Sequence, residues 1–172
     1  GDDGQLAVRL VKVGADAAPR IAEAVKSGDF SGLSDLAISE DDKAFLEKQT
    51  RIALRNCGVV DPESIESYRA AGGYKALEKI ISTGMSGEDV IEEIKISALA
   101  GRGGAGFPTW FKWNAARKSQ GEEKYLICNA DEGDPGAFMD RSILEGDPHA
   151  LIEAMAIAAY AIGADEGYVY VR

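Results

Sequence analysis

Two glycine-rich stretches carry the residues whose types and spacing could hold a cofactor. Residues 101–108 have the sequence Gly-Arg-Gly-Gly-Ala-Gly-Phe-Pro, and residues 128–136 have the sequence Cys-Asn-Ala-Asp-Glu-Gly-Asp-Pro-Gly. Glycine lets a backbone adopt positive φ and approach a ligand closely, at an entropic cost of about 0.5–1 kcal/mol in a regular element. We therefore predict a cofactor cradle formed by Gly101, Arg102, Gly103, Gly104, Ala105 and Gly106.

Other glycine motifs fit this stretch less well. Gly101, Gly103 and Gly106 match the pattern G-x-G-x-x-G, but a Rossmann fingerprint follows a strand, whereas residues 90–98 have helical periodicity. A P-loop needs a Gly-Lys-Ser/Thr step, and none follows these glycines. A plain structural turn stays open as an alternative.

The residues around the first stretch favour a nucleotide over a plain turn. Arg102 and Lys112 can neutralise phosphate, and Phe107 offers a flat face to a base. A helix predicted to begin near Thr109 would supply free N–H groups, which bind anions. Taken alone, a phenylalanine such as Phe107 is more often a core residue.

The second stretch follows an apolar run, residues 124–128, that predicts a buried strand. Asn129, Asp131 and Glu132 would then lie at the carboxyl end of this strand, where open parallel sheets bind ligands. The Asn129 amide can donate and accept, as the edge of a flavin or a nicotinamide amide requires. The carboxylates of Asp131 and Glu132 suit ribose hydroxyls, although a solvated acidic turn is the alternative.

Composition narrows the class of protein. The chain has 172 residues, 45% of them hydrophobic, which is enough for the core of one ordinary domain. A formal net charge of -10 argues against broad binding to nucleic acid or to an anionic membrane. Cys57 and Cys128 lie far apart, so we expect no metal site and no disulfide framework, and both thiols to be buried. The longest apolar run, residues 154–164, is shorter than the ~20 residues that cross a bilayer.

Sequence patterns predict an α/β fold in which a helical N-terminal section precedes a parallel sheet. The predicted division is a tail or linker (1–37), a helical section (38–100) and the first part of an α/β domain (101–172). We expect helices over 20–26, from Ser39 to the Cys57–Gly58 step, from the Asp61–Pro62 step, over 74–82, from Ser86, over 109–118 and over 148–162. Strands at 124–128 and 167–172, with a helix between them, form the pattern of a βαβ unit.

Residues 97–109, 112–113 and 128–149 together resemble one family, that of the NADH-binding flavoprotein subunit of complex I and its relatives. Within that family they are most similar to the soluble branch, the NAD-reducing or electron-bifurcating hydrogenases and formate dehydrogenases. The resemblance covers roughly residues 45–172. It implies that residues 101–172 are the first part of a Rossmann-like FMN- and NADH-binding α/β domain, which is incomplete at the C-terminus, with NAD(H) stacked over the flavin. It also implies that hydride passes to flavin N5 and that electrons leave through iron–sulfur clusters.

The resemblance also implies a role for each predicted site residue. Residues 101–106 and Lys112 would surround the FMN phosphate and ring edge, and Asn129 and Asp131 would contact the flavin or its ribityl chain. Phe107 would stack on the adenine, and Glu132, the candidate catalytic residue, would lie near the nicotinamide ribose.

The implied partners are iron–sulfur subunits of one complex, namely a thioredoxin-like 2Fe-2S subunit and a catalytic hydrogenase or dehydrogenase subunit, in the cytoplasm. Because the chain begins with Gly1 and ends in a strand-like run, we expect a fragment whose iron–sulfur motif lies in a C-terminal part or in partner subunits. The alternative is a non-catalytic assembly or interaction module.

Overall fold

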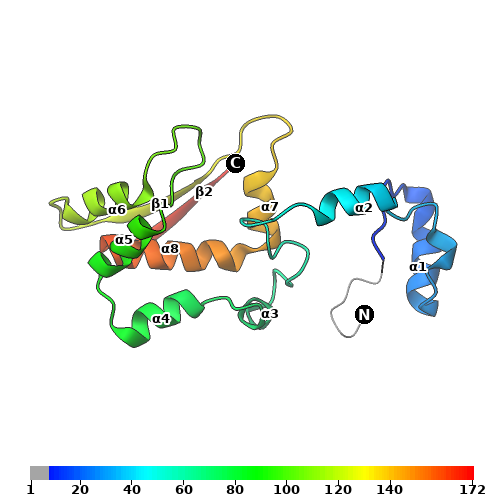
Figure 1. Ribbon diagram of the computed structural model, residues 1–172, viewed down its shortest axis with the longest axis horizontal. Helices are drawn as coiled ribbons and strands as arrows, with labels where there is room; N and C mark the ends of the chain where they lie inside the picture. The colour runs from blue at the N-terminus through cyan, green and yellow to red at the C-terminus, as the bar shows by residue number, and fades with distance from the viewer. Residues whose placement is uncertain (1–7) are drawn as a thin grey trace. The chain divides into compact units, whose positions relative to one another are not determined.

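The computed structural model describes residues 8–172 and divides the chain into two compact units (Figure 1). Unit 1 is Gly1–Arg51 and unit 2 is Ile52–Arg172. The described elements of unit 1 are η1 (Ala15–Ala17), α1 (Ala18–Ser27), η2 (Ser31–Leu33) and α2 (Glu40–Glu47). Those of unit 2 are α3 (Ile65–Ala70), α4 (Lys75–Thr83), α5 (Gly87–Ile96), α6 (Thr109–Lys118), β1 (Tyr125–Ala130), α7 (Met139–Gly146), α8 (Pro148–Ile162) and β2 (Glu166–Val171).

Unit 1 is built around α1, which packs against η2 and buries a small core of Ala17, Ala24 and Leu33. An isolated antiparallel bridge pairs Leu10 with Ala37. The helix expected over residues 20–26 is present as α1. Because its core is so small, this unit has few apolar contacts with which to resist local opening.

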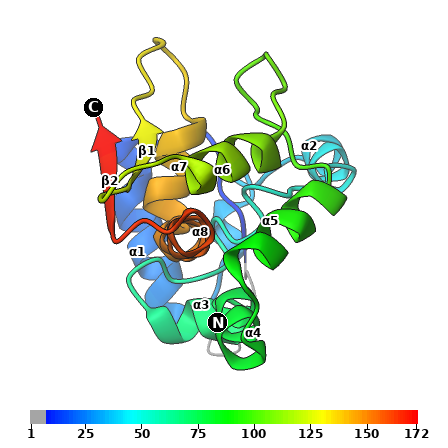
Figure 2. The same cartoon turned by 90° about the vertical axis from the view of Figure 1, so that its left-hand side faces the viewer.

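The long helix α8 lies at the centre of unit 2 and contacts α4, α5, α6, α7 and both strands (Figure 2). Ala161 on this helix is fully buried in a cluster with Ile80, Val90 and Ile91. Small alanine side chains let α5 and α6 approach α8 closely, so the helices that flank the first glycine stretch rest on the centre of the unit.

The two strands pair in parallel, from Tyr125 opposite Glu166 to Ala130 opposite Val171. Since α7 and α8 separate them in the sequence, β1, α8 and β2 form the expected βαβ unit, and the predicted α/β class is confirmed. The expectation that the first strand is buried is wrong. Its exposure alternates, and Ile127 is 66% exposed, because α8 packs on one face of the pair and Ile127 points to the other.

A buried carboxylate from α8 joins the helices that precede the sheet. Tyr74 has a φ of 61° at the start of α4 and offers no side-chain cap, so the helix N-terminus needs an acceptor from elsewhere. Glu153 supplies it, accepting the Tyr74 and Leu77 amides at 2.8 and 3.3 Å and the Tyr68 hydroxyl at 2.6 Å. Burial, and then this carboxylate, raise the pKa of Tyr68. His149 Nδ1 and the Tyr74 hydroxyl form a hydrogen bond of 2.9 Å, so His149 has a structural contact in this region.

The long helix expected from Ser39 to the Cys57–Gly58 step is wrong. Ser39 does cap α2, accepting the Asp42 amide, but α2 ends at Glu47, and residues 52–60 form a series of turns. The Asn56 amide donates to buried Asp147 at 2.8 Å, and the Cys57 thiol donates to the Ser142 carbonyl at 3.4 Å. These contacts with the start of α8 and with α7 replace the helical hydrogen bonds that local periodicity favours.

Several other element boundaries test the sequence patterns. The helix expected from the Asp61–Pro62 step instead begins at Ile65, because Ser64 is its N-cap. Ser86 and Asp89 form the capping box of α5, as their spacing predicts. The bounds expected for α6 and α8 agree with the structure.

Candidate cofactor site

The first glycine stretch forms a closed loop between α5 and α6, which we call the glycine loop (residues 97–108). An antiparallel bridge between Ala100 and Pro108 closes its base, and the Gly101 amide donates to the Phe107 carbonyl at 2.8 Å. Beyond this base, Gly104 and Gly106 have φ angles of 90° and 59°. The loop therefore needs glycine at these two positions on conformational grounds.

The outer glycines of the loop are not required by packing within the chain. A Cβ built on Gly103, Gly104 or Gly106 would meet no atom within 4 Å, and residues 101–108, including Arg102 and Ala105, are exposed. Since no side chain of the described residues fills this space, the backbone is open to a ligand.

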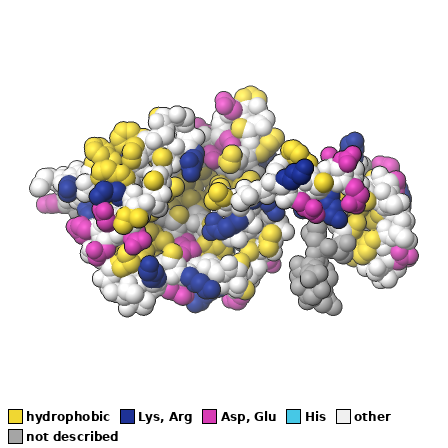
Figure 3. All heavy atoms as spheres, viewed as in Figure 1, with side chains coloured by type: hydrophobic (Ala, Val, Ile, Leu, Met, Phe, Trp, Pro, Cys, Tyr) yellow, Lys and Arg dark blue, Asp and Glu magenta, His cyan; other side chains and the backbone are white. Residues whose placement is uncertain are grey.

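Aromatic and cationic side chains lie at the base of the glycine loop. The Phe107 and Phe111 rings pack edge to face with centroids 5.6 Å apart, and Phe107 is 43% exposed. The Lys112 ammonium lies 5.5 Å from the Phe107 centroid, within cation–π range. Figure 3 shows hydrophobic side chains gathered over α6 in this part of unit 2. A half-exposed ring beside a cation can accept a nucleotide base and its phosphates.

The two tryptophans of α6 pack toward the core of unit 2. Trp110 and Trp113 are partly buried against the cluster of α4, α5 and α8. The Lys95 ammonium lies 5.6 Å from the Trp110 ring, a contact that the sequence alone did not indicate. The α6 N-terminus has Pro108 as its N-cap and no side-chain cap, so no side chain competes with an anion there.

The polar residues after β1 make mostly local hydrogen bonds. The Asn129 side-chain oxygen accepts the Asp131 amide at 3.1 Å, and both residues are exposed. Glu132 instead accepts the backbone amides of Met139, Asp140 and Arg141 at 2.8, 3.2 and 3.2 Å. Partial burial raises the pKa of Glu132, but these three donors lower it by more, so its net pKa lies below the ordinary value.

Glu132 therefore has a contact that sequence reasoning missed, because it holds the N-terminus of α7. The signal that could have indicated it is an acidic residue seven positions before a helix with no side-chain cap. Glu132 also lines a hollow of about 470 Å³ at the carboxyl edge of the two strands, together with Ala130, Phe138, Arg141, Val171 and Arg172. Unit 1 contains a hollow of about 570 Å³ that none of the predicted site residues lines.

The structure places the predicted residues in two groups. Gly101, Arg102, Gly103, Gly104, Ala105, Gly106, Phe107 and Lys112 lie on the glycine loop and the first turn of α6. Asn129, Asp131 and Glu132 lie at the end of β1 and in the loop that follows it. Both loops extend from the same side of unit 2 in two perpendicular views (Figures 1 and 2).

Residues 94–172 match the family model described as the Nuo51 FMN-binding domain. This match includes the glycine loop, α6 and both strands. Residues 94–172 belong to the Nuo51 FMN-binding domain family. The family resemblance that the two glycine-rich stretches predict is thereby confirmed.

Proteins with related sequences include subunits of hydrogenases and of NADH-quinone oxidoreductases. The NADP-reducing hydrogenase subunit HndC of Solidesulfovibrio fructosivorans is 56% identical over 126 residues, which are 73% of this chain and 25% of that protein. A subunit of the NADH-quinone oxidoreductase of Rhizobium meliloti (strain 1021) is 52% identical over 121 residues, 70% of this chain and 28% of that protein. The chain thus spans about a quarter of the length of these relatives.

The chain is also similar to a solved structure. The crystal structure of an NAD+-reducing [NiFe]-hydrogenase in the air-oxidized state superposes with a TM-score of 0.50 at 27% identity, over 96% of this chain and 27% of that chain.

Among residues 8–172, no helix is both long enough and apolar enough to cross a membrane. No group of three or more His, Cys, Asp or Glu among these residues is placed to hold a metal ion.

Proposed function

We propose that this chain provides part of the FMN site in the flavoprotein subunit of an NAD(H)-dependent flavin oxidoreductase. The observation that carries the proposal is the open glycine loop inside the segment that matches the Nuo51 FMN-binding domain. Its glycines leave space that nothing else in the described chain fills, beside a lysine and a helix N-terminus. Family membership and this local geometry support the same ligand.

In this proposal the backbone of residues 101–106, with Arg102 and Lys112, holds the phosphate and ring edge of FMN. Asn129 and Asp131 contact the flavin or its ribityl chain from the end of β1. FMN supplies, when bound, the exchange of hydride with NAD(H) and of single electrons with iron–sulfur clusters. The chain's own contribution is to bind, orient and shield these groups.

NAD(H) would lie over the flavin, with its adenine on the half-exposed Phe107 ring. We propose that Glu132, the candidate catalytic residue, lies near the nicotinamide ribose. The contacts of Glu132 with α7 support a positioned carboxylate, because three amides hold it in one orientation. The same contacts compensate part of its charge, so we expect only a weak electrostatic bias against the 2′-phosphate of NADP(H).

We propose further that residues 101–172 are the first part of the FMN- and NADH-binding domain, behind a helical section (38–100) and a tail or linker (1–37). The partners would be a thioredoxin-like 2Fe-2S subunit and a catalytic hydrogenase or dehydrogenase subunit, in the cytoplasm. Relatives named as subunits of hydrogenase and of NADH-quinone oxidoreductase support a multisubunit setting.

The test uses the full-length protein, purified with its native partners. Flavin is released by denaturation and identified by its absorbance and mass, and NADH-dependent reduction of an artificial dye is measured on the native sample. We expect about one FMN in each copy of the protein and dye reduction by NADH. A sample without FMN and without NADH oxidation would contradict the proposal and favour the assembly module instead.

A further inference from the structure

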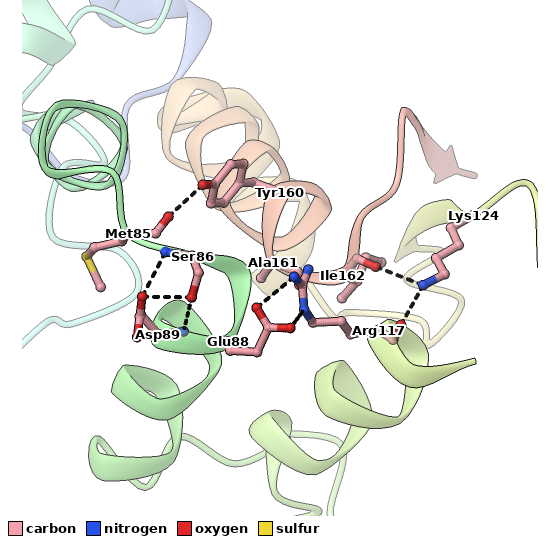
Figure 4. Close-up of polar contacts among 9 residues, drawn as sticks. All are labelled: Met85, Ser86, Glu88, Asp89, Arg117, Lys124, Tyr160, Ala161 and Ile162. Atoms are coloured by element: carbon pink, nitrogen blue, oxygen red, sulfur yellow. Dashed lines mark hydrogen bonds and ion pairs between the residues drawn. The ribbon is translucent and has the colours of Figure 1, made fainter. Parts of the chain in front are cut away.

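Arg117, near the C-terminus of α6, joins three helices of unit 2 (Figure 4). Its Nε and Nη2 atoms donate to the two carboxylate oxygens of Glu88 on α5, at 2.6 and 2.7 Å. Its Nη1 atom donates to the Ala161 carbonyl in the last turn of α8, at 3.0 Å. The fork-like pair with Glu88 uses the planar geometry of the guanidinium, which lysine cannot reproduce.

The backbone of α5 leaves room for this guanidinium. A Cβ built on Gly87 would lie 2.7 Å from the Ala161 carbonyl oxygen and 2.8 Å from Arg117 Cζ, and it would also overlap Arg117 Nη1. Real Cβ atoms essentially never approach so closely, so any larger residue at position 87 must displace Arg117 or α8. Glycine at this position is therefore a second, independent sign that the contact shapes this region.

A second cation acts at the same place. The Lys124 ammonium donates to the Arg117 carbonyl at 2.6 Å and to the Ile162 carbonyl at 3.4 Å, which are terminal carbonyls of α6 and α8 (Figure 4). Two helix C-termini carry negative partial charge and free carbonyls, and Arg117 and Lys124 satisfy both. Lys124 directly precedes β1, so these contacts lie at the start of that strand.

Arg117 and Glu88 lie at the ends of α5 and α6 that are far from the glycine loop. Glu88 is in the first turn of α5 and Arg117 in the last turn of α6, whereas the loop joins the other ends of these helices. The pair thus closes the open end of a helical hairpin whose tip is the glycine loop. A change in the angle between the two helices would move the tip by more than it moves the pair.

We propose that Arg117, with Glu88 and Lys124, is a positioning residue that sets the geometry of the glycine loop toward the end of β1, and through it the affinity for FMN. This inference rests on the proposed function. Arg117 touches no ligand itself, and it acts through α5, α6 and α8. The hydrogen bond to the Glu88 carboxylate raises the pKa of the Arg117 guanidinium further above its ordinary value.

The test compares variants of the full-length protein by their FMN dissociation constants. FMN is removed from each purified holoprotein, and its rebinding is titrated by flavin fluorescence at a temperature well below that of unfolding. Arg117→Lys keeps the positive charge but cannot form both hydrogen bonds to the Glu88 carboxylate. Gly87→Ala displaces the guanidinium, although alanine itself favours a helix. Arg69→Lys is the matched ion-pair control, because Arg69 pairs with Glu78 at 3.0 Å between α3 and α4 on the exposed surface. Gly32→Ala is the matched glycine control, since nothing lies within 4 Å of its Cβ position.

We expect Arg117→Lys and Gly87→Ala each to raise the FMN dissociation constant about tenfold and both controls to stay within about twofold of wild type. The flavin midpoint potential should shift in the same two variants, a readout that a purely structural role would leave unchanged. The proposal would be overturned if, in both variants, the FMN dissociation constant stayed within twofold of wild type and the midpoint potential equalled that of wild type within experimental error. This holds even if the unfolding temperature of the variants is lower. If wild-type protein binds no FMN, the proposed function fails first and this inference fails with it.

Discussion

Unit 2 uses glycine in two regions for opposite reasons. In the helical scaffold, a Cβ on Gly73 would overlap ring atoms of buried Tyr68, and a Cβ on Gly146 would lie 3.0 Å from Cys57 Sγ. In the glycine loop, a Cβ on Gly103 or Gly104 would meet nothing within 4 Å. Gly73 and Gly146 let parts of the chain approach one another, whereas the loop glycines leave the backbone exposed.

The comparison predicts that substitutions in the loop disrupt cofactor binding without unfolding the protein. Gly103→Glu should weaken FMN binding about a thousandfold, because a carboxylate beside the phosphate costs several kcal/mol. The measurement is flavin content and FMN titration, with urea unfolding of the FMN-free protein in parallel. Gly103→Lys is the matched control for bulk, and it should retain more flavin. If NADH oxidation by the complete assembly were unchanged in Gly103→Glu, the loop would be a plain turn.

The converse prediction concerns the scaffold. Gly73→Ala should lower the free energy of unfolding by about 2–3 kcal/mol, because the new methyl group overlaps the Tyr68 ring, which is only 2% exposed. Urea unfolding measures this change, with Gly32→Ala as the control at an open position. A free energy of unfolding within about 0.5 kcal/mol of wild type, the range of an ordinary surface substitution, would mean that packing does not require glycine at position 73.

A third prediction distinguishes the role of Phe107 at the base of the loop, in NADH binding, from that of the loop glycines, in FMN binding. Phe107→Ala should raise the KM for NADH about tenfold, because base stacking on an aromatic ring contributes about 1–3 kcal/mol. Reduced nicotinamide mononucleotide lacks the adenine, so its kinetics should change little in the same variant. FMN content should also stay near wild type. Equal losses with both substrates would place Phe107 outside the adenine site.

The smallest expected effect belongs to Glu132, whose carboxylate the α7 amides already hold. Glu132→Gln should reduce the preference for NAD(H) over NADP(H) only about threefold, as measured by steady-state kinetics with both cofactors. Glu78→Gln is the control, since that carboxylate pairs with exposed Arg69 outside this hollow. An unchanged cofactor ratio would remove Glu132 from the selectivity of the site.

Glu132 also predicts a pH dependence. Its pKa in the folded protein lies below the ordinary 4.5, so its stabilisation of α7 is present above that value and is lost as the pH falls through the folded-state pKa. Glu132→Gln should therefore flatten the loss of stability below about pH 4.5, as urea unfolding at several pH values would show. A pH profile equal to that of wild type would argue that other carboxylates dominate acid unfolding.

Some elements were predictable because their signals are local. The capping box of Ser86 and Asp89 spans four residues, and the periodicity of α6 and α8 lies within single helices. The strand, helix and strand order predicts parallel pairing, since a right-handed crossover is the common connection. The long helix expected after Ser39 failed for the opposite reason, because Asn56 bonds with Asp147, 91 positions away.

By itself, the sequence determined the residue types of the two glycine-rich stretches, the family of residues 94–172 and the helices whose caps and periodicity are local. Only the tertiary structure decided that the loop glycines face open space, that Glu132 holds α7 and that Arg117 joins α5, α6 and α8. The physical reason is the sequence separation over which each kind of interaction acts. Dihedral preferences and caps act over a few residues, whereas Arg117 meets Glu88 across 29 positions and Ala161 across 44, through packing that no local pattern encodes.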